Sequence, residues 1–210
     1  MIQTAKQVKD DKKRSIQKQI TKSITIEEGI KQLFPNYKFS MEQIKHEIKE
    51  IETHLEKFFM NLKDKEFPSK EKPYPIAYSL DNDSGILLYL LCRIIKPNIV
   101  VETGVAYGRS TACILQALNE NEKGTLYSID STFRPWETKE MIGSAIPENL
   151  KNRWEFSQGT TRSKLKNILE MTDGIDIFIH DSLHTYQNMT YEFNTVWPHI
   201  KKMDIYFRMI

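Results

Sequence analysis

An apolar run that ends in an acid and two glycines constrains the fold of this chain more than any other stretch. Residues 99–101 are Ile-Val-Val, Glu102 follows, and the turn Thr103–Gly108 leads into Ser110-Thr111. A short β-branched run that leads into a glycine-containing turn is typical of a buried strand, and Ser-Thr is typical of a helix start. Glycine lets a backbone approach a ligand closely, and a helix N-terminus offers free N–H groups. The stretch therefore predicts a strand, a ligand-binding turn and a helix.

Short apolar runs alternate with helical stretches from residue 99 onward. The runs that we expect to be strands are Ile99–Glu102, Thr125–Asp130, Trp154–Gln158 and Ile175–His180. The stretches that we expect to be helices are Ser110–Asn119, Lys139–Leu150, Arg162–Met171 and Tyr186–Ile200. Alternation at this spacing is typical of βαβ units, whose helices cover a parallel sheet. We therefore predict an α/β fold with a Rossmann-like, doubly wound, mostly parallel sheet.

The residues before this sheet divide into two regions. Residues 1–39 are rich in Lys, Gln and Thr without a regular apolar pattern, so we expect a basic, mobile arm. Residues 40–80 predict a helical extension followed by a linker, because three prolines lie between Phe67 and Pro75. Residues 81–210 then form the Rossmann-like domain.

The predicted helix at residues 40–62 carries one apolar stripe, because apolar residues recur at alternating spacings of three and four. The stripe consists of Met41, Ile44, Ile48, Ile51, Leu55, Phe58 and Leu62. Such a stripe must be buried against something. Packing on its own domain and pairing with a second copy in a homodimer are both open.

Charge and hydropathy exclude several classes of protein. Lys and Arg number 30 against 28 Asp and Glu, a net charge of +2, whereas a dedicated nucleic-acid binder has a strong basic excess. The longest apolar run, Ile86 to Cys92, is far shorter than the roughly 20 residues of a membrane span. The first twenty residues are too polar for a secretory signal. Cys92 and Cys113 form no CxxC pair, so we expect a reduced, cytoplasmic protein without nucleic-acid or membrane partners.

A second acid ends the next predicted strand, where Asp130 follows Thr125–Ile129. A carboxylate at the tip of the second strand can accept both hydroxyl protons of a ribose. Glu102, at the end of the first strand, would repel a pyrophosphate and suits a ligand that bears an ammonium group. The glycine spacing also differs from the GxGxxG of dinucleotide-binding dehydrogenases, which argues against a nicotinamide-dependent oxidoreductase.

These two stretches resemble two motifs of the class I S-adenosyl-L-methionine-dependent methyltransferases. Residues 99–111 resemble the first motif and Tyr127–Asp130 the second, and the resemblance covers roughly residues 87–200. It implies that the turn holds the methionine end of the cofactor, that Asp130 holds the ribose and that Gly159 lies near the adenine. The cofactor-binding residues implied for the turn are Glu102, Thr103, Gly104, Gly108 and Ser110.

The predicted fourth strand ends in His180-Asp181-Ser182-Leu183-His184, which is similar to a subgroup of small-molecule methyltransferases. We expect His180 or His184 to act as general base for an alcohol and Asp181 to orient it or to bind a divalent metal. In the metal-dependent catechol-type enzymes, which this stretch also resembles, the metal-binding aspartate falls on His180 and the catalytic lysine on Leu183. Both differences argue against that mechanism.

The residues after Ile200 depart from the family pattern. Relatives place Gly-Gly before a fifth strand, whereas this chain continues as residues 201–210 without it. We therefore expect a C-terminally truncated domain that lacks the last strands of the family sheet. The predicted function is methyl transfer to an oxygen of a small molecule or sugar. The alternative is an inactive fragment that acts as a cofactor-binding or helix-mediated interaction module.

Overall fold

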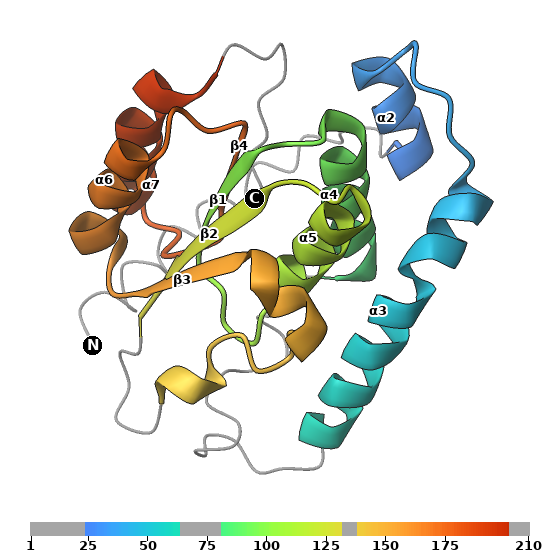
Figure 1. The fold of residues 1–210 in the computed structure, drawn as a ribbon, viewed down its shortest axis with the longest axis horizontal. Coiled ribbons are helices and arrows are strands. Elements are labelled where there is room, and N and C mark those ends of the chain that lie inside the picture. The colour runs from blue at the N-terminus through green and yellow to red at the C-terminus, as the bar shows by residue number, and fades with distance from the viewer. Residues whose placement is uncertain (1–23, 64–80, 132–137, 202–210) are drawn as a thin grey trace, which may run out of the picture.

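The computed structural model describes residues 24–63, 81–131 and 138–201, and a four-stranded parallel sheet lies at its centre (Figure 1). The strands are β1 (Ile99–Thr103), β2 (Thr125–Asp130), β3 (Trp154–Gln158) and β4 (Ile177–His180), in the order β3-β2-β1-β4. Thr103 lies beside Ile129 on one side and His180 on the other. The carboxyl ends of β1, β2 and β4 are therefore level, and the predicted α/β fold is confirmed.

Helices cover both faces of the sheet (Figure 1). On one face lie α4 (Asn82–Ile95) and α5 (Arg109–Glu120), and on the other α6 (Thr161–Met171) and α7 (Tyr186–Val196). Each face has its own apolar core. The first contains Leu115 and Leu118 of α5, and the second contains Leu165 of α6 and Val196 of α7. The sheet is thus doubly wound, as predicted.

The start of β4 differs from the sequence prediction. Ile175 does not pair with β1; it forms an isolated parallel bridge with Ile200, in which the Lys201 N–H donates to the Ile175 carbonyl at 2.9 Å. Asp176 then turns inward, and its Oδ2 accepts the backbone N–H groups of Asn98 at 2.6 Å and Ile99 at 2.8 Å. This carboxylate fixes the amino end of β1, so β4 itself begins two residues later than expected.

The apolar stripe of α3 (Met41–Lys63) is buried within its own chain, against α4 and α5. The exposed fraction of Ile48 is 0% and that of Leu55 is 3%. Near the end of the stripe Phe59 is buried, at 6% exposure, and Phe58 only in part. Of the two open possibilities, packing on its own domain is the one observed, and the stripe is not available to a second copy in this structure.

The expected boundary of the mobile arm is wrong. Residues 26–33 form α2 (Ile26–Leu33), which begins with a capping box between Thr25 and Glu28. Ile30 on this helix has no exposed surface and belongs to the first apolar core. Residues 24–39 therefore do not belong to an arm. Residues 1–23 and the predicted proline-rich linker lie outside the described residues.

The helix predicted for residues 139–150 is also absent from this described stretch. Two short 3₁₀ helices take its place, η2 (Lys139–Met141) and η3 (Glu148–Arg153). Gly143 between them has a φ of 72°, and Pro147 has no N–H to donate, so a continuous helix cannot form. Pro198 likewise ends α7 early, and η4 (Trp197–His199) follows it.

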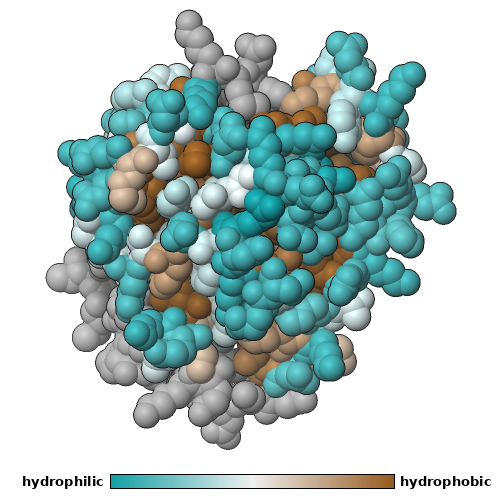
Figure 2. Space-filling view, in the orientation of Figure 1, coloured by the Kyte–Doolittle hydropathy of each residue, from teal (hydrophilic) through white to brown (hydrophobic). Residues whose placement is uncertain are grey.

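The described surface is mainly hydrophilic on the face seen in Figure 2, with scattered hydrophobic areas between polar side chains. Within residues 24–63, 81–131 and 138–201, none of the helices combines the length and the apolar character that crossing a membrane requires.

Candidate functional site

The turns that follow the four strands meet at the carboxyl end of the sheet. Three backbone hydrogen bonds tie them together: Gly104 N–H to the Ile129 carbonyl at 2.9 Å, Gly159 N–H to the Asp130 carbonyl at 2.8 Å, and Asp181 N–H to the Thr103 carbonyl at 2.8 Å. Because crevices at this end of open α/β sheets are where ligands bind, this edge is the candidate site.

Gly104 lies directly under the turn that follows β4. Its φ is 89°, and a β-carbon at this position would overlap the Asp181 carbonyl oxygen and lie 2.8 Å from the Ser182 nitrogen. The glycine is therefore required by the crossing of two backbone segments. This crossing brings the Asp181 turn against the glycine turn, which the sequence could not show.

Asp130 organises the glycine turn from the tip of β2. Its Oδ2 accepts the backbone N–H groups of Val105 and Ala106, both at 2.8 Å, and its Oδ1 accepts that of Ser131 at 2.6 Å. The side chain is half-buried. A carboxylate predicted from the sequence as a ligand contact is thus also a structural brace.

Glu102 is buried beneath the turn, with no exposed surface. Its carboxylate accepts hydroxyl protons from Ser110 at 2.6 Å, Thr111 at 2.7 Å and Ser128 at 2.9 Å. Burial raises the pKa of Glu102 to about 7, although the three hydroxyl hydrogen bonds oppose this rise. Through these hydrogen bonds Glu102, which lies on β1, holds the first turn of α5 and the strand β2 together beneath the glycine turn.

The rear of the glycine turn is packed against protein. The Gly143 N–H donates to the Ala106 carbonyl at 2.8 Å and the Ala145 N–H to the Tyr107 carbonyl at 2.9 Å. A β-carbon on Gly108 would lie 2.8 Å from Ile146, so this second glycine also admits a neighbouring segment. Among the described residues, this side of the turn is thus closed to a ligand.

The α3 helix braces the same turn. The rings of Phe58 and Phe59 pack edge-on against Tyr107, with centroid distances of 5.8 and 5.9 Å. A ring N–H of His54 faces the Ala145 carbonyl at 3.0 Å. The helical extension is thus part of the wall of the site.

A histidine–aspartate pair lies on the turn after β4. The Nε2 atom of His184 is 3.4 Å from Oδ1 of Asp181, and both side chains are about one-third exposed. The ring of His180 lies 5.1 Å from that of His184, but His180 itself has no exposed surface. Of the two predicted bases, only His184 is accessible from outside.

Glu192 on α7 was missed by the sequence analysis. It is fully buried, and its Oε2 lies 2.6 Å from Nδ1 of His180 and accepts a hydrogen bond from Thr103 at 2.7 Å. Its Oε1 accepts from Ser182 and Asn188, both at 2.7 Å. One signal pointed to it, since Glu192 stands one helical turn before buried Val196, a position where an acid is unexpected.

The described residues offer no ready metal centre. They contain no group of three or more His, Cys, Asp or Glu side chains placed to hold a metal ion. Asp181 has His184 beside it, whereas the neighbouring His180 turns to Glu192. The expectation that Asp181 binds a divalent metal gains no support from this geometry.

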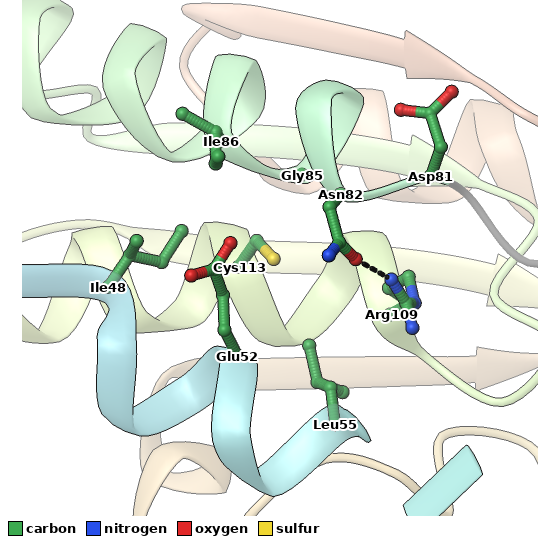
Figure 3. Close-up of a pocket in the computed structure, with 9 residues that line it drawn as sticks. All are labelled: Ile48, Glu52, Leu55, Asp81, Asn82, Gly85, Ile86, Arg109 and Cys113. Atoms are coloured by element: carbon green, nitrogen blue, oxygen red, sulfur yellow. Dashed lines mark hydrogen bonds between the residues drawn. The ribbon is translucent and has the colours of Figure 1, made fainter. Parts of the chain in front are cut away.

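A small pocket lies away from the strand ends, between α3, α4 and α5 (Figure 3). Glu52 and Leu55 of α3 face Asn82 and Arg109, whose side chains are joined by a hydrogen bond of 2.5 Å. Its volume of about 10 Å³ is that of roughly one water molecule. It is too small for an organic substrate, so the strand ends remain the candidate site.

Comparison with known proteins identifies the region that carries this site. A family model described as a methyltransferase domain matches residues 101–203, which include every strand end described above. Residues 101–203 are therefore similar to a methyltransferase domain. No curated protein sequence matches the chain.

Three solved structures share the fold of this chain. An O-methyltransferase from Bacillus cereus has a TM-score of 0.55 and 17% identity, over 83% of this chain and 67% of that one. The O-methyltransferase TomG from Streptomyces achromogenes has a TM-score of 0.54 and 19% identity, over 70% of this chain and 60% of that one. The Podospora anserina methyltransferase PaMTH1 has a TM-score of 0.51 and 13% identity, over 79% of this chain and 68% of that one.

The residues predicted to bind a cofactor fall into two groups in the structure. Gly104, Asp130 and Gly159 are partly exposed at the strand ends. Glu102, Thr103, Gly108 and Ser110 are buried behind them. The first group can touch a ligand directly, and the second shapes the turn on which the first group lies.

Proposed function

We propose that this chain transfers a methyl group from S-adenosyl-L-methionine to an oxygen atom of a small molecule, such as a sugar or another alcohol. The observation that carries the proposal is the contact between two turns: the Asp181 backbone packs directly on Gly104. This contact sets the Asp181–His184 pair against the glycine turn, so a base and a cofactor surface adjoin.

The residues at the strand ends fit S-adenosyl-L-methionine. The half-buried Asp130 carboxylate lies at the tip of the second strand, where a ribose hydroxyl is bound in related folds. Gly104 and Gly159 carry no side chains to obstruct a nucleoside beside Asp130. The solved structures of the Bacillus cereus and Podospora anserina proteins were obtained with S-adenosylhomocysteine and that of TomG with S-adenosylmethionine, which supports the same cofactor here.

The polar side chains beside the cofactor surface suit an alcohol acceptor. When bound, S-adenosyl-L-methionine supplies an electrophilic methyl group. His184 would serve as the general base that takes the hydroxyl proton of the acceptor, and loss of the methyl group would leave the cofactor as S-adenosylhomocysteine. Because Nε2 of His184 faces Asp181, Nδ1 is the atom left to take the proton, and Asp181 stabilises the resulting imidazolium.

An oxygen acceptor and a small molecule are the specific parts of this proposal. The Bacillus cereus protein and TomG are both O-methyltransferases, which supports the oxygen acceptor. A net charge of only +2 supports a small molecule over a nucleic acid. A reduced, cytoplasmic location is also proposed, supported by Cys92 and Cys113, which are both buried free thiols.

Thermal unfolding with and without S-adenosylhomocysteine tests the cofactor site. At about 100 times its dissociation constant the ligand stabilises a native site by roughly 2.7 kcal/mol, which raises the Tm by several degrees. We expect this rise in the native chain and not in Asp130→Ala. Asp176→Ala is the matched control, because it removes the same kind of carboxylate brace at the opposite end of the sheet. An unchanged Tm in the native chain would overturn the proposal.

A further inference from the structure

The buried carboxylate of Glu192 joins four parts of the fold at once. Its donors come from the end of β1 (Thr103), the end of β4 (His180), the turn that bears the histidine–aspartate pair (Ser182) and α7 (Asn188). A carboxylate offers about four lone-pair positions, and here four donors lie at 2.6 to 2.7 Å. Its hydrogen-bonding capacity is therefore filled.

Thr103, Ser182 and Asn188 each donate a hydrogen bond to Glu192, which favours its ionised form. Burial alone would raise the pKa of Glu192, but the hydrogen bonds from His180, Ser182 and Thr103 outweigh it and leave the pKa below its usual value. An ionised carboxylate can only accept hydrogen bonds. Nδ1 of His180 must therefore carry a hydrogen, which leaves Nε2 as the atom whose protonation is not fixed by Glu192.

Nε2 of His180 is the unusual atom of this cluster. It is buried and has no hydrogen-bond partner among the described residues, whereas Nδ1 is held at 2.6 Å from Glu192. Leaving a buried polar atom unpaired is costly, so the surrounding structure must fix the ring in place. The ring lies 5.1 Å from that of His184 and 5.7 Å from that of Phe193.

The same cluster also fixes the turn from residue 181 to 185. Nδ2 of Asn188 donates to Ser182 Oγ at 3.0 Å and to the Leu183 carbonyl at 3.2 Å, in addition to Glu192. The Asn188 N–H donates to the Thr185 side chain at 3.3 Å, which caps α7. Both ends of the turn that bears Asp181 and His184 are thus tied to α7.

We propose that Glu192 is a positioning residue, which fixes His180 as the Nδ1–H form and holds the Asp181–His184 turn over Gly104. It acts through these neighbours and does not touch the acceptor, since it has no exposed surface. This inference rests on the proposed function of His184. The arrangement itself, one ionised acid with four donors, is a property of the chain without ligand.

Glu192→Gln gives a sharp test because glutamine keeps the shape and replaces one acceptor oxygen with a donor. The Asn188 amide nitrogen cannot accept a hydrogen bond, so we expect the new NH₂ group to turn away from it and toward His180 and Thr103. Nδ1 of His180 must then accept a hydrogen bond. The ring proton is therefore expected to move from Nδ1 to Nε2.

Histidine-selective ¹⁵N NMR on the full chain without ligand measures this directly, since protonated and unprotonated ring nitrogens differ widely in chemical shift. The His180 signals are assigned as those lost in His180→Asn. We expect Nδ1–H in the native chain and Nε2–H in Glu192→Gln. Thr103→Val is the matched control, because it removes another Glu192 donor while leaving the His180 hydrogen bond, and should retain Nδ1–H.

Two results would overturn the proposal: Nε2–H in the native chain, or Nδ1–H retained in Glu192→Gln. The first result does not depend on Glu192→Gln, so it decides the matter even where that variant does not fold. The ring signals of His184 should also shift in Glu192→Gln, and unchanged signals would mean that the turn does not depend on Glu192. Failure of the proposed methyltransferase function would be seen separately, as a missing S-adenosylhomocysteine shift with the NMR result unaffected.

Discussion

Asp130 and Asp176 make the same pattern of hydrogen bonds at opposite ends of one sheet. Each accepts two backbone N–H groups through a single carboxylate oxygen, Asp130 from Val105 and Ala106 and Asp176 from Asn98 and Ile99. Only Asp130 stands where the turns after the strands converge. The pair therefore allows a structural contribution to be separated from a contribution to ligand binding.

Asp130→Ala and Asp176→Ala should destabilise the fold by similar amounts. Asp130→Ala leaves three backbone N–H groups without their charged acceptor and Asp176→Ala leaves two, so we expect each to lose about 1–3 kcal/mol in the free energy of unfolding. Urea denaturation followed by circular dichroism measures both values. A loss in Asp130→Ala alone would show that Asp176 does not brace β1.

Gly104→Ala should be strongly destabilising, because the position combines a φ of 89° with a clash against the Asp181 carbonyl. A loss of about 1–3 kcal/mol is expected from the backbone conformation alone, before the turn after β4 is displaced. Gly29→Ala is the control: Gly29 lies inside α2, where a β-carbon has ordinary space and alanine favours the helix by up to about 1 kcal/mol. Equal Tm values for the two variants would contradict this account.

The raised pKa of Glu102 predicts how the stability of the fold depends on pH. The pKa of Glu102 is about 7 in the folded chain, against 4.5 as its ordinary value. Between these values the folded chain holds more protons than the unfolded chain, so the contribution of Glu102 to stability falls as the pH rises from 4.5 to 7. Relative to Glu102→Gln, the native chain should lose on the order of 3 kcal/mol across this window. Denaturation of both chains at pH 5 and pH 8 measures this loss. If the difference in free energy of unfolding between the native chain and Glu102→Gln is the same at both pH values, the prediction is refuted.

Ile48→Ala on α3 should cost about 2–4 kcal/mol, because the side chain has no exposed surface and its removal leaves a cavity. Met60→Ala on the same helix should change stability by less than about 0.5 kcal/mol, since Met60 is 69% exposed. Analytical ultracentrifugation should give the same molecular mass for both variants as for the native chain. A dimer that is lost in Ile48→Ala would mean that the stripe pairs between copies.

The strands and the outline of the site were predictable because they depend on local sequence. Apolar runs bounded by glycine, asparagine or acids predicted all four strands, and their carboxyl ends placed Asp130 and Asp181 at one edge of the sheet. The short helix α2 also had a local signal, the Thr25–Glu28 capping box, which the polar composition of residues 1–39 obscured. The broken helix at residues 139–150 depended on Gly143, whose positive φ serves a contact with the glycine turn.

The hydrogen bonds and packing contacts within the site could not be predicted from the sequence in the same way. Glu192 lies twelve residues from His180 along the chain, and its spacing from Val196 indicates an inward position without showing which side chains it meets there. The roles of Glu102, Gly104 and Gly108 could not be predicted either, because they depend on the neighbouring segments that pack against these residues. A sequence pattern identifies the residues at a strand end, whereas only the packing decides which of them face a ligand and which support those that do.

The packing of Phe58 and Phe59 on Tyr107 has a practical consequence for dividing this chain. A shortened chain that begins at residue 81 would keep every residue of the strand-end site and lose the rings that back its glycine turn. The aromatic ring of Tyr107, now 1% exposed, would face water. A version of this domain made for expression or for exchange should therefore begin before α3. A version with the sheet alone would lack the aromatic rings that pack behind the glycine turn.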